Sequence, residues 1–405
     1  MKSLIELFPQ SIEVNDEGQR RSCLVRETLD SGEVVESDLW FIYPLNVPMP
    51  KDDNCDSYLL SVFLLGMRLN ANISVRGSVS KALLANLTEL QLIWNKWCPE
   101  TYSIIEITVD NIRENDVQVD GAIVAFSGGA DAQFTAYRHA TGKAGYCTQQ
   151  LRAGILIHGF DIPFTDVEGF AGAAKKATDT LDDLGLPLLV VKTNLSRTWG
   201  KGSKTKSVNW EHHCGMAVAA VLNGLSSYAG TGLIGSGSPY DELDIWGSHP
   251  MTDPLFSSDS FKMIHDGAGF SRSEKIKALS DWTVGVKNLR ICWESNLKDR
   301  NCGSCEKCVR TRINFLLAGT NEPACFDSPL DTSLLKNIVL HGKGSTRNWK
   351  QLRDEIKSTG KAIEWLPQVE KVLKRKSGSK LGFLLPQGSQ RRVLVKNLLI
   401  KIKRV

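Results

Sequence analysis

The segment Ser127-Gly128-Gly129-Ala130-Asp131-Ala132 has the residue types of a loop that binds phosphate. It follows the apolar run of residues 121–126 and precedes residues suited to a helix. Two glycines let the backbone turn until successive N–H groups converge, and a helix start adds partial positive charge. Ser127 can donate its hydroxyl to a phosphate oxygen, while Asp131 can bind Mg²⁺ or accept hydrogen bonds that shape the loop. A tight turn without a ligand is the alternative, because a bare Gly-Gly pair is common in turns.

Four of the ten cysteines are closely spaced, in the pattern C-x9-C-x2-C-x2-C: Cys292, Cys302, Cys305 and Cys308. Four thiolates at this spacing can complete a tetrahedral Zn²⁺ site, with Gly303 relieving the turn. An iron–sulfur cluster also takes four thiolates, and a redox pair needs only two. Because no open coordination position is implied, we expect a zinc ion that stabilises this region rather than reacts.

A stretch rich in basic residues and free of acidic ones separates Pro187 from Trp210: it contains Lys192, Arg197, Lys201, Lys204 and Lys206. A loop with several cations could stabilise pyrophosphate as it leaves. For any single lysine, a solvated surface position is the alternative.

Residues 121–320 alternate apolar runs with amphipathic stretches. The runs are residues 121–126, 153–158, 187–192, 230–234 and 286–292, and helices are expected from about Ala130, Val167, His212, Ser271 and Ser304. Ser271 and Glu274 form the S-x-x-E pattern of a capping box. This alternation predicts an α/β fold with a mostly parallel sheet covered on both faces. Ligands of such sheets bind at the carboxyl ends of the strands.

Three regions are predicted from composition and pattern. Residues 1–118 indicate a small α+β domain, residues 119–322 the α/β domain, and residues 323–405 a basic helical region. Residues 371–405 carry 11 Lys and Arg and no acid, although the whole chain has a net charge of only +4. An amphipathic basic tail suits docking on an acidic protein, a nucleic acid or an anionic membrane surface. We favour docking within a protein complex, because aromatic residues for base stacking are nearly absent there.

The overall composition is that of a soluble protein, with 42% hydrophobic and 23% charged residues. The first ten residues contain an acid and a proline where a secretory signal would be apolar. No run of about 20 apolar residues occurs. We therefore expect a cytoplasmic protein without membrane insertion.

The phosphate loop resembles the S-G-G-x-D-S motif of the PP-loop ATP pyrophosphatases, which split ATP between the α and β phosphates. Ser127, Gly128, Gly129 and Asp131 match, whereas Ala132 stands where the family usually has a hydroxyl. The missing hydrogen bond would be worth about 1 kcal/mol. The resemblance also implies that Asp161, after the second apolar run, lies where such enzymes hold adenosine, although Gly-x-Asp-x-Pro is common in loops.

The order of the motifs along the chain resembles that of one family of PP-loop enzymes. A PP-loop segment followed by Cys292-Trp293, the run C-G-S-C-E-K-C, and then Arg310 and Arg312 resembles the 7-cyano-7-deazaguanine synthase (QueC) family over about residues 119–320. This resemblance implies a ligase that adenylates the carboxylate of 7-carboxy-7-deazaguanine. An amine then displaces AMP to give an amide, which a second ATP dehydrates to a nitrile.

Two regions depart from that family. Ordinary members lack both the N-terminal 118 residues and the long basic C-terminal region. The layout resembles extended QueC-like proteins associated with bacterial anti-phage defence, in which the accepting amine could belong to a partner protein. The sequence leaves open whether the product is an amide, a nitrile or a protein conjugate, and whether the chain forms a homodimer.

Asp253 is the candidate for substrate binding. It lies in G-S-H-P-M-T-D-P-L-F-S-S, where family members have a short Pro-Asp signature. A carboxylate can accept from the N1–H and the exocyclic amine of a guanine-like ring. The alternative is an ordinary Asp-Pro turn.

Two other functions remain open. One is a non-catalytic nucleotide-binding scaffold, with Ala132 as the mark of a decayed loop. The other is a PP-loop enzyme that modifies tRNA, for which Cys147 and Cys214 are the candidate thiols, although neither lies in a recognisable motif. Nucleic acid is therefore not excluded as a partner, but it is not favoured.

Overall fold

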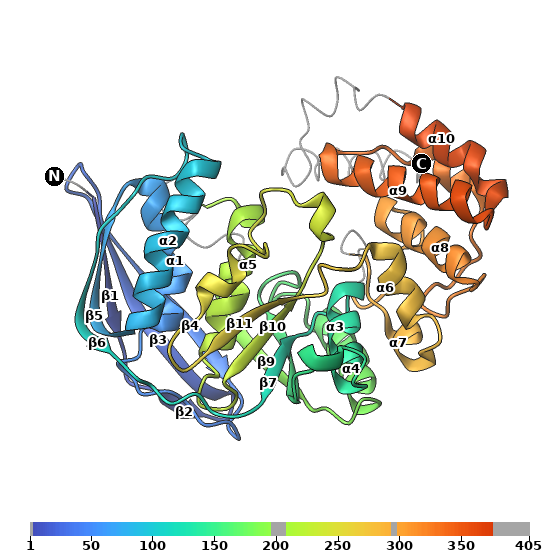
Figure 1. Ribbon diagram of the computed structural model, residues 1–405. Coiled ribbons are helices and arrows are strands. Elements are labelled where there is room, and N and C mark those ends of the chain that lie inside the picture. The colour runs from blue at the N-terminus through green and yellow to red at the C-terminus, as the bar shows by residue number, and fades with distance from the viewer. Residues whose placement is uncertain (1–2, 196–207, 293–297, 376–405) are drawn as a thin grey trace, which may run out of the picture. The chain divides into compact units, whose positions relative to one another are not determined.

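The computed structural model describes residues 3–195, 208–292 and 298–375 (Figure 1). The chain divides into two compact units, Met1–Pro329 and Leu330–Val405. Within the described part of the chain, none of the helices has both the length and the apolar character needed to cross a membrane.

The first unit is built on one eleven-stranded sheet. Its strands are β1 (Leu4–Pro9), β2 (Glu13–Asn15), β3 (Gly18–Thr28), β4 (Val34–Tyr43), β5 (Asn72–Ser80), β6 (Ile107–Arg113), β7 (Ala122–Ala125), β8 (Leu151–His158), β9 (Leu188–Thr193), β10 (Thr231–Gly235) and β11 (Lys262–Asp266). The strand order is β11-β10-β7-β8-β9-β4-β3-β1-β5-β6, and β2 pairs with β3. The five strands from β11 to β9 are parallel, as are β1, β5 and β6, whereas β3 and β4 pair antiparallel with their neighbours. The predicted α/β class with a mostly parallel sheet is confirmed.

The N-terminal region continues this sheet. Strand β4 pairs antiparallel with β9, where Phe41 lies opposite Thr193. The Thr193 hydroxyl also donates to the carbonyl of Trp40 at 2.7 Å. The boundary expected near residue 118 is therefore not a break in the sheet, and a separately folding N-terminal domain stays a prediction.

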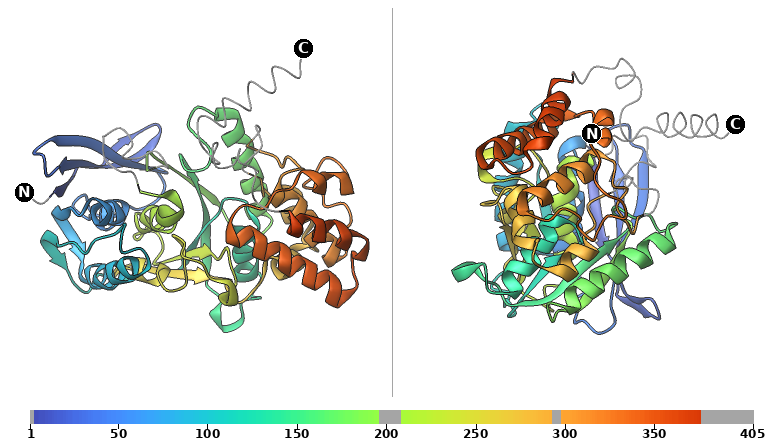
Figure 2. Two further views of the ribbon diagram at one scale, coloured as in Figure 1. Left: turned by 90° about the horizontal axis from the view of Figure 1, so that it is seen from above. Right: turned by 90° about the vertical axis from the view of Figure 1, so that its right-hand side faces the viewer.

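Helices cover both faces of the sheet. Successive side chains of β7 point to opposite faces and enter different cores. Ile123 belongs to the core shared with α1 (Asp56–Leu69), α2 (Lys81–Trp97) and α5 (Trp210–Asn223), which lie on one side of the strands (Figure 2). Ala122 and Val124 point to the other core, with α3 (Ala130–Ala140) and α4 (Val167–Asp182). Successive side chains of a strand face opposite ways, so a strand buried on both faces is apolar throughout.

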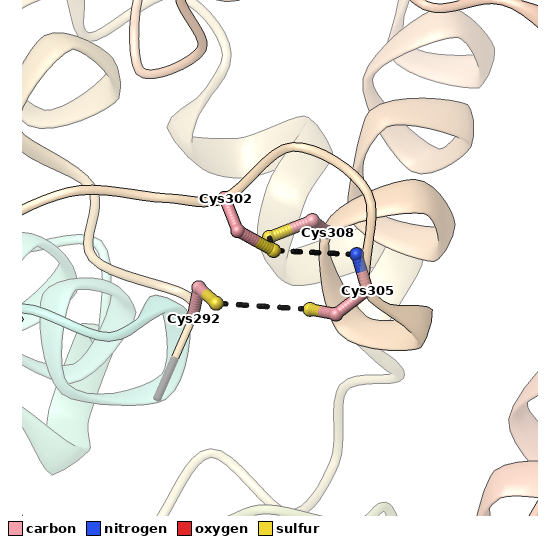
Figure 3. A group of neighbouring side chains, drawn as sticks. All are labelled: Cys292, Cys302, Cys305 and Cys308. Carbon is pink, nitrogen blue, oxygen red and sulfur yellow. Dashed lines mark hydrogen bonds between the residues drawn. The ribbon is translucent and has the colours of Figure 1, made fainter. Parts of the chain in front are cut away.

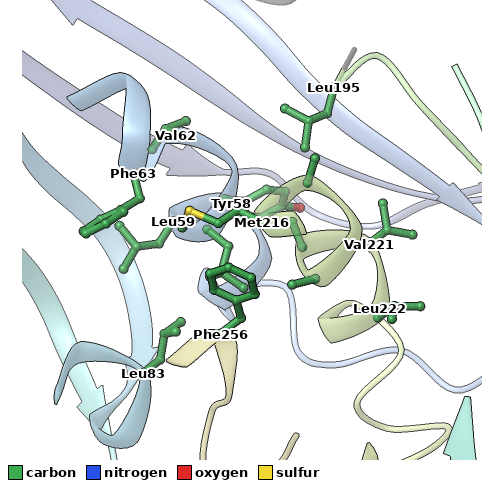
Figure 4. Packing of buried hydrophobic residues seen from close by; sticks show 14 of the residues in the cluster. Tyr58, Leu59, Val62, Phe63, Leu83, Leu195, Met216, Val221, Leu222 and Phe256 are labelled. Atoms are coloured by element: carbon green, nitrogen blue, oxygen red, sulfur yellow. The ribbon is translucent and has the colours of Figure 1, made fainter. Parts of the chain in front are cut away.

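Helix α1 is the main element that the sequence pattern missed. Twelve of its 14 residues are buried, and Figure 4 shows Tyr58 and Leu59 packed near Met216 of α5 and Phe256. A helix that is buried nearly all round lacks the exposed polar face that marks a surface helix.

The later elements follow the expected order with one difference. Helix α6 (Arg272–Leu279) begins after Ser271 with the predicted capping box, and α8 (Glu306–Ala318) begins two residues after the expected Ser304. The apolar run 286–292, expected to be a strand, instead contains the end of α7 (Thr283–Asn288) and an extended stretch without sheet pairing. Strand β11, which was not predicted, supplies the fifth parallel strand of this part of the sheet. It lies at the end of the strand order, and its sequence KMIHD has no long apolar run.

The second unit is helical over its described residues, as expected. It contains α9 (Gly342–Thr359) and α10 (Leu366–Lys374), with Trp349, Leu352 and Val369 buried. The basic tail lies mostly in residues 376–405, outside the described part of the chain, so its docking role stays a prediction.

Candidate functional site

The loop of residues 127–132 has the predicted strand–loop–helix setting. Strand β7 ends at Ala125, Gly128 has a φ of 75°, and Gly129 is the N-cap of α3. The amide of Gln133 makes the first hydrogen bond of the helix, to the carbonyl of Gly129 at 2.9 Å. The amides of residues 130–132 therefore have no carbonyl within the helix and are donors for an anion.

Arg290, which follows α7, donates two hydrogen bonds to the loop. Its backbone N–H donates to the carbonyl of Gly128 at 2.8 Å, and its guanidinium donates to the carbonyl of Ser127 at 3.0 Å. These bonds fix the loop carbonyls on the side of Arg290. They explain how a left-handed glycine can be held in place before a ligand binds.

Asp131, in the first turn of α3, lies between two cations of α6. Arg272 contacts one carboxylate oxygen at 2.8 Å and Lys275 the other at 3.2 Å. Burial by itself would raise the pKa of the Asp131 carboxyl, but the charges of Arg272 and Lys275 outweigh it and keep the pKa below the ordinary value. Burial lowers the pKa of the Lys275 ammonium, while Asp131 opposes that shift. Asp131 therefore joins the start of α3 to α6, and its role as a Mg²⁺ ligand or a loop-shaping acceptor stays a prediction.

A cavity of about 490 Å³ opens beside the loop. Its volume lies within the range of small-molecule sites. Residues from the loop, α5, α6 and α8 line it, and its basic members are Arg272, Arg290, Lys307 and Arg310. Three carboxylates also line the cavity: Asp131, Asp161 and Glu211. The mixture of cations and helix amides suits a polyphosphate.

A second, more apolar hollow of about 280 Å³ adjoins the first at the ends of β7, β8 and β10. Ser127, Asp161 and Arg290 line both hollows. Ala132 lines the second hollow and is 9% exposed, with its methyl group in the core beneath α3. An apolar hollow next to a cationic cavity offers room for a ring system joined to phosphates.

The four cysteines converge at the start of α8 (Figure 3). All four sulfur atoms lie within 4.8 Å of one another. The sulfur atoms of Cys292 and Cys305 are 3.7 Å apart, and those of Cys302 and Cys308 are 3.9 Å apart. Zn–S bonds of about 2.3 Å at tetrahedral angles place sulfur atoms about 3.8 Å apart. The cluster therefore fits a zinc ion, as the spacing predicted.

Neighbouring polar groups orient this cluster. The Cys305 amide donates to the sulfur of Cys302 at 3.3 Å, and Gly303 makes the turn with a φ of 71°. Arg312 donates to the carbonyl of Gly303 at 3.0 Å, and the Asn301 side-chain oxygen accepts from the amide of Cys292 at 3.1 Å. Hydrogen bonds around metal ligands fix their orientation.

Asp253 does not line either hollow beside the loop. It lies in the 3₁₀ helix η3 (Asp253–Phe256), is fully buried, and accepts hydrogen bonds from the hydroxyl of Ser248 at 2.6 Å and the amide of His249 at 3.0 Å. The Nδ1 atom of His265 is 2.7 Å from the same carboxylate. Asp253 thus ties η3 to β11, and direct contact with a substrate stays a prediction.

Several predicted residues cannot be placed at the site. Arg197, Lys201, Lys204, Lys206 and Trp293 lie outside the described residues. Of the predicted basic stretch, Lys192 is described, and its ammonium is 3.5 Å from Glu17.

Several residues at the site were not predicted from the sequence: the basic residues Arg272, Lys275 and Arg290 and the cavity-lining Trp246. Cys214 was a candidate thiol without a recognisable motif. The sequence did contain a pattern that could have indicated Arg272 and Lys275, since they are three residues apart in the first turn of a helix with a predicted cap. Arg290 had none, because its contacts are with a loop 163 residues away.

Comparison of the chain with protein families, with curated proteins and with solved structures finds no match.

Proposed function

We propose that this chain activates a carboxylate by transferring AMP to it from ATP, and that an amine then replaces the AMP. One observation carries the proposal. The loop of residues 127–132, at the carboxyl end of β7 and the start of α3, opens into a cavity lined by Arg272, Arg290, Lys307 and Arg310. Helix amides and several cations are the groups that stabilise a leaving pyrophosphate.

The residues of the loop divide the work of holding the nucleotide. The amides of residues 130–132 and the hydroxyl of Ser127 would bind phosphate oxygens, while the apolar hollow that contains Ala132 and Ile157 would take the base. Asp161 lines both hollows, where a ribose would lie. Asp131 keeps Arg272 and Lys275 close to the phosphates and could exchange one of them for Mg²⁺.

The proposed chemistry needs no side-chain nucleophile. A carboxylate oxygen of the substrate attacks the α-phosphorus, the bond to the bridging oxygen breaks, and pyrophosphate leaves with the electron pair. The amine then attacks the acyl carbon, AMP leaves, and the amine loses a proton. Positioning and fixed charges supply the acceleration. The substrate class, a 7-deazaguanine carboxylate such as 7-carboxy-7-deazaguanine, and a role in anti-phage defence rest on the resemblance to the QueC family.

The test is mass spectrometry of reactions that contain ATP, Mg²⁺, zinc-loaded protein and 7-carboxy-7-deazaguanine, with ammonium or candidate partner proteins as the amine. The expected result is AMP and pyrophosphate together with an amide, a nitrile or a conjugated protein. A zinc-loaded protein that releases AMP equally with and without the carboxylate would contradict the proposed substrate.

A second candidate function has one observation in its favour. Cys214, one of the two candidate thiols, lines both hollows beside the loop. A thiol at this place suits a tRNA-modifying enzyme that transfers sulfur. If that function is correct, Cys214→Ser abolishes turnover and tRNA binds with a steep salt dependence. The ligase function instead predicts that Cys214→Ser retains carboxylate-dependent pyrophosphate release.

A further inference from the structure

A stretch of four residues, 289–292, connects the cysteine cluster to the phosphate loop. Cys292 at its end is one of the four clustered cysteines. Two residues earlier, the backbone N–H of Arg290 donates to the carbonyl of Gly128 at 2.8 Å. The guanidinium of Arg290 donates to the carbonyl of Ser127 at 3.0 Å. One short segment therefore contains both a cysteine of the cluster and the residue that bonds to the loop.

The loop depends on this segment for its shape. Gly128 has a φ of 75°, in the left-handed region that only glycine adopts freely, and glycine is also the residue with the most freedom to leave it. A Cβ atom on Gly128 would lie 3.6 Å from the Cβ of Arg290, an ordinary contact, so the position favours glycine for its φ and not for lack of space. The two hydrogen bonds from Arg290 restrain the carbonyls on either side of the turn.

The segment has little regular structure of its own to hold it. Residues 289–292 follow α7 without pairing to a strand. The Asn301 side chain replaces a strand partner, because its oxygen accepts from the amides of Ile291 and Cys292 at 2.8 and 3.1 Å. Its NH₂ group donates to the carbonyl of Leu289 at 2.8 Å. Asn301 directly precedes Cys302, so its hydrogen bonds join the segment to the metal cluster, while Leu289 is also buried in a core with Ile276 and Phe315.

We propose that Arg290 is a positioning residue through which zinc at the four cysteines holds the phosphate loop ready for nucleotide. Zinc fixes Cys292 and the turn after Asn301, these fix the segment 289–292, and Arg290 fixes Ser127 and Gly128. The proposal rests on the proposed function only in that the loop binds ATP. Metal loading then sets the affinity for nucleotide, although the metal takes no part in the chemistry.

The test is loop exchange, meaning hydrogen exchange of the amides of Arg290 and Gln133, which donate to the loop carbonyls of Gly128 and Gly129, in the full chain without nucleotide. Three samples are compared: zinc-loaded protein, chelator-treated protein and the zinc-loaded variant Arg290→Met. The variant keeps all four cysteines and the backbone N–H. It removes the bond from the guanidinium to Ser127 and one cation of the cavity, and exchange measured without nucleotide reports on the lost bond. Because a hydrogen bond from a charged donor has a large effect, exchange in the loop should rise about tenfold in the variant. It should rise further after zinc removal, which releases both bonds.

Nucleotide affinity provides the second readout. The dissociation constant of an ATP analogue with a methylene group between the α and β phosphates should rise about tenfold in Arg290→Met, with one zinc ion still bound per chain. Arg290→Lys should recover part of the loss. Arg300→Met is the matched control, since Arg300 lies in the same region, is exposed and pairs with the adjacent Asp299.

Unchanged loop exchange in both the zinc-free protein and Arg290→Met would overturn the proposal. Weaker nucleotide binding with unchanged loop exchange would also overturn it, because Arg290 would then act by direct contact. A zinc-loaded wild-type protein that does not bind the analogue would contradict the proposed function instead, while the exchange experiment would still test the coupling.

Discussion

Asp131 shows how one carboxylate organises the site at the scale of single residues. It accepts from Arg272 and Lys275, both on α6, and so places two cations at the start of α3. Lys275 also donates to the carbonyl of Ser236, directly after β10. The ion pairs therefore connect three elements around the loop.

The variant Lys275→Met should lower the free energy of unfolding by about 1–2 kcal/mol at pH 7, because a buried charge pair loses one partner. The pKa of Asp131 is lowered in the folded protein, so its stabilising contribution is complete above the unfolded pKa of about 4 and is lost as the pH falls through the folded pKa. Urea unfolding from pH 7 to pH 3 measures this. The difference between wild type and variant should shrink below about pH 4, and a difference that grows there would contradict the assignment.

Asp253 should behave as a structural residue. Asp253→Asn replaces an oxygen that accepts hydrogen bonds with an NH₂ group, so the buried contacts to Ser248, His249 or His265 are lost. The expected cost is about 1–3 kcal/mol in the free energy of unfolding. Thermal unfolding and the KM for the carboxylate are the two measurements. A stable variant with a raised KM would restore the direct substrate contact that the sequence suggested.

At the scale of elements, helix α6 determines where Arg272 and Lys275 lie. Its capping box joins the Ser271 hydroxyl to the amide of Glu274, and the Glu274 carboxylate accepts from the amide of Ser271. A loose first turn would release both cations from Asp131.

Ser271→Ala should therefore destabilise the protein by about 1 kcal/mol, the usual cost of losing an N-cap. It should also weaken nucleotide binding, because Arg272 occupies the first helical position. Ser271→Thr, which keeps a hydroxyl, is the matched control. Equal stability and affinity in the Ala and Thr variants would show that the cap does not position these cations.

The elements in which apolar and polar residues alternate clearly were predictable from the sequence, and those without such a pattern were not. Helices α3 and α4 begin at the expected residues because their amphipathic stretches follow apolar runs. Helix α1 was missed because it is buried nearly all round, and β11 because it is short and polar. The loop and the cysteines were predictable because their residues are close in sequence. Arg290 was not, since only the tertiary fold brings it to Gly128.

At the scale of the whole molecule, residues 1–118 and the loop domain share a sheet and a core. Strand β9 has β4 as its neighbour, and α5 packs beside α1. Met216 and Ala220 of α5 are fully buried in this shared core. Removing the N-terminal region would expose this apolar surface to water.

A fragment of residues 119–405 should therefore fail to unfold cooperatively. It should also aggregate, because an uncovered β9 edge can pair with other chains. Circular dichroism during heating, with the full chain as control, is the measurement. A soluble fragment with a sharp thermal transition would instead establish residues 119–322 as an independent domain.

The proposed activity is ATP-dependent activation of a carboxylate at the loop of residues 127–132. The most direct measurement is the exchange of radiolabelled pyrophosphate into ATP, which requires reversible adenylation and no amine. We predict exchange by zinc-loaded protein that depends on 7-carboxy-7-deazaguanine and falls at least about tenfold in Asp131→Asn, which weakens the hold on Arg272 and Lys275. Absence of exchange in protein that binds both zinc and ATP would contradict the claim.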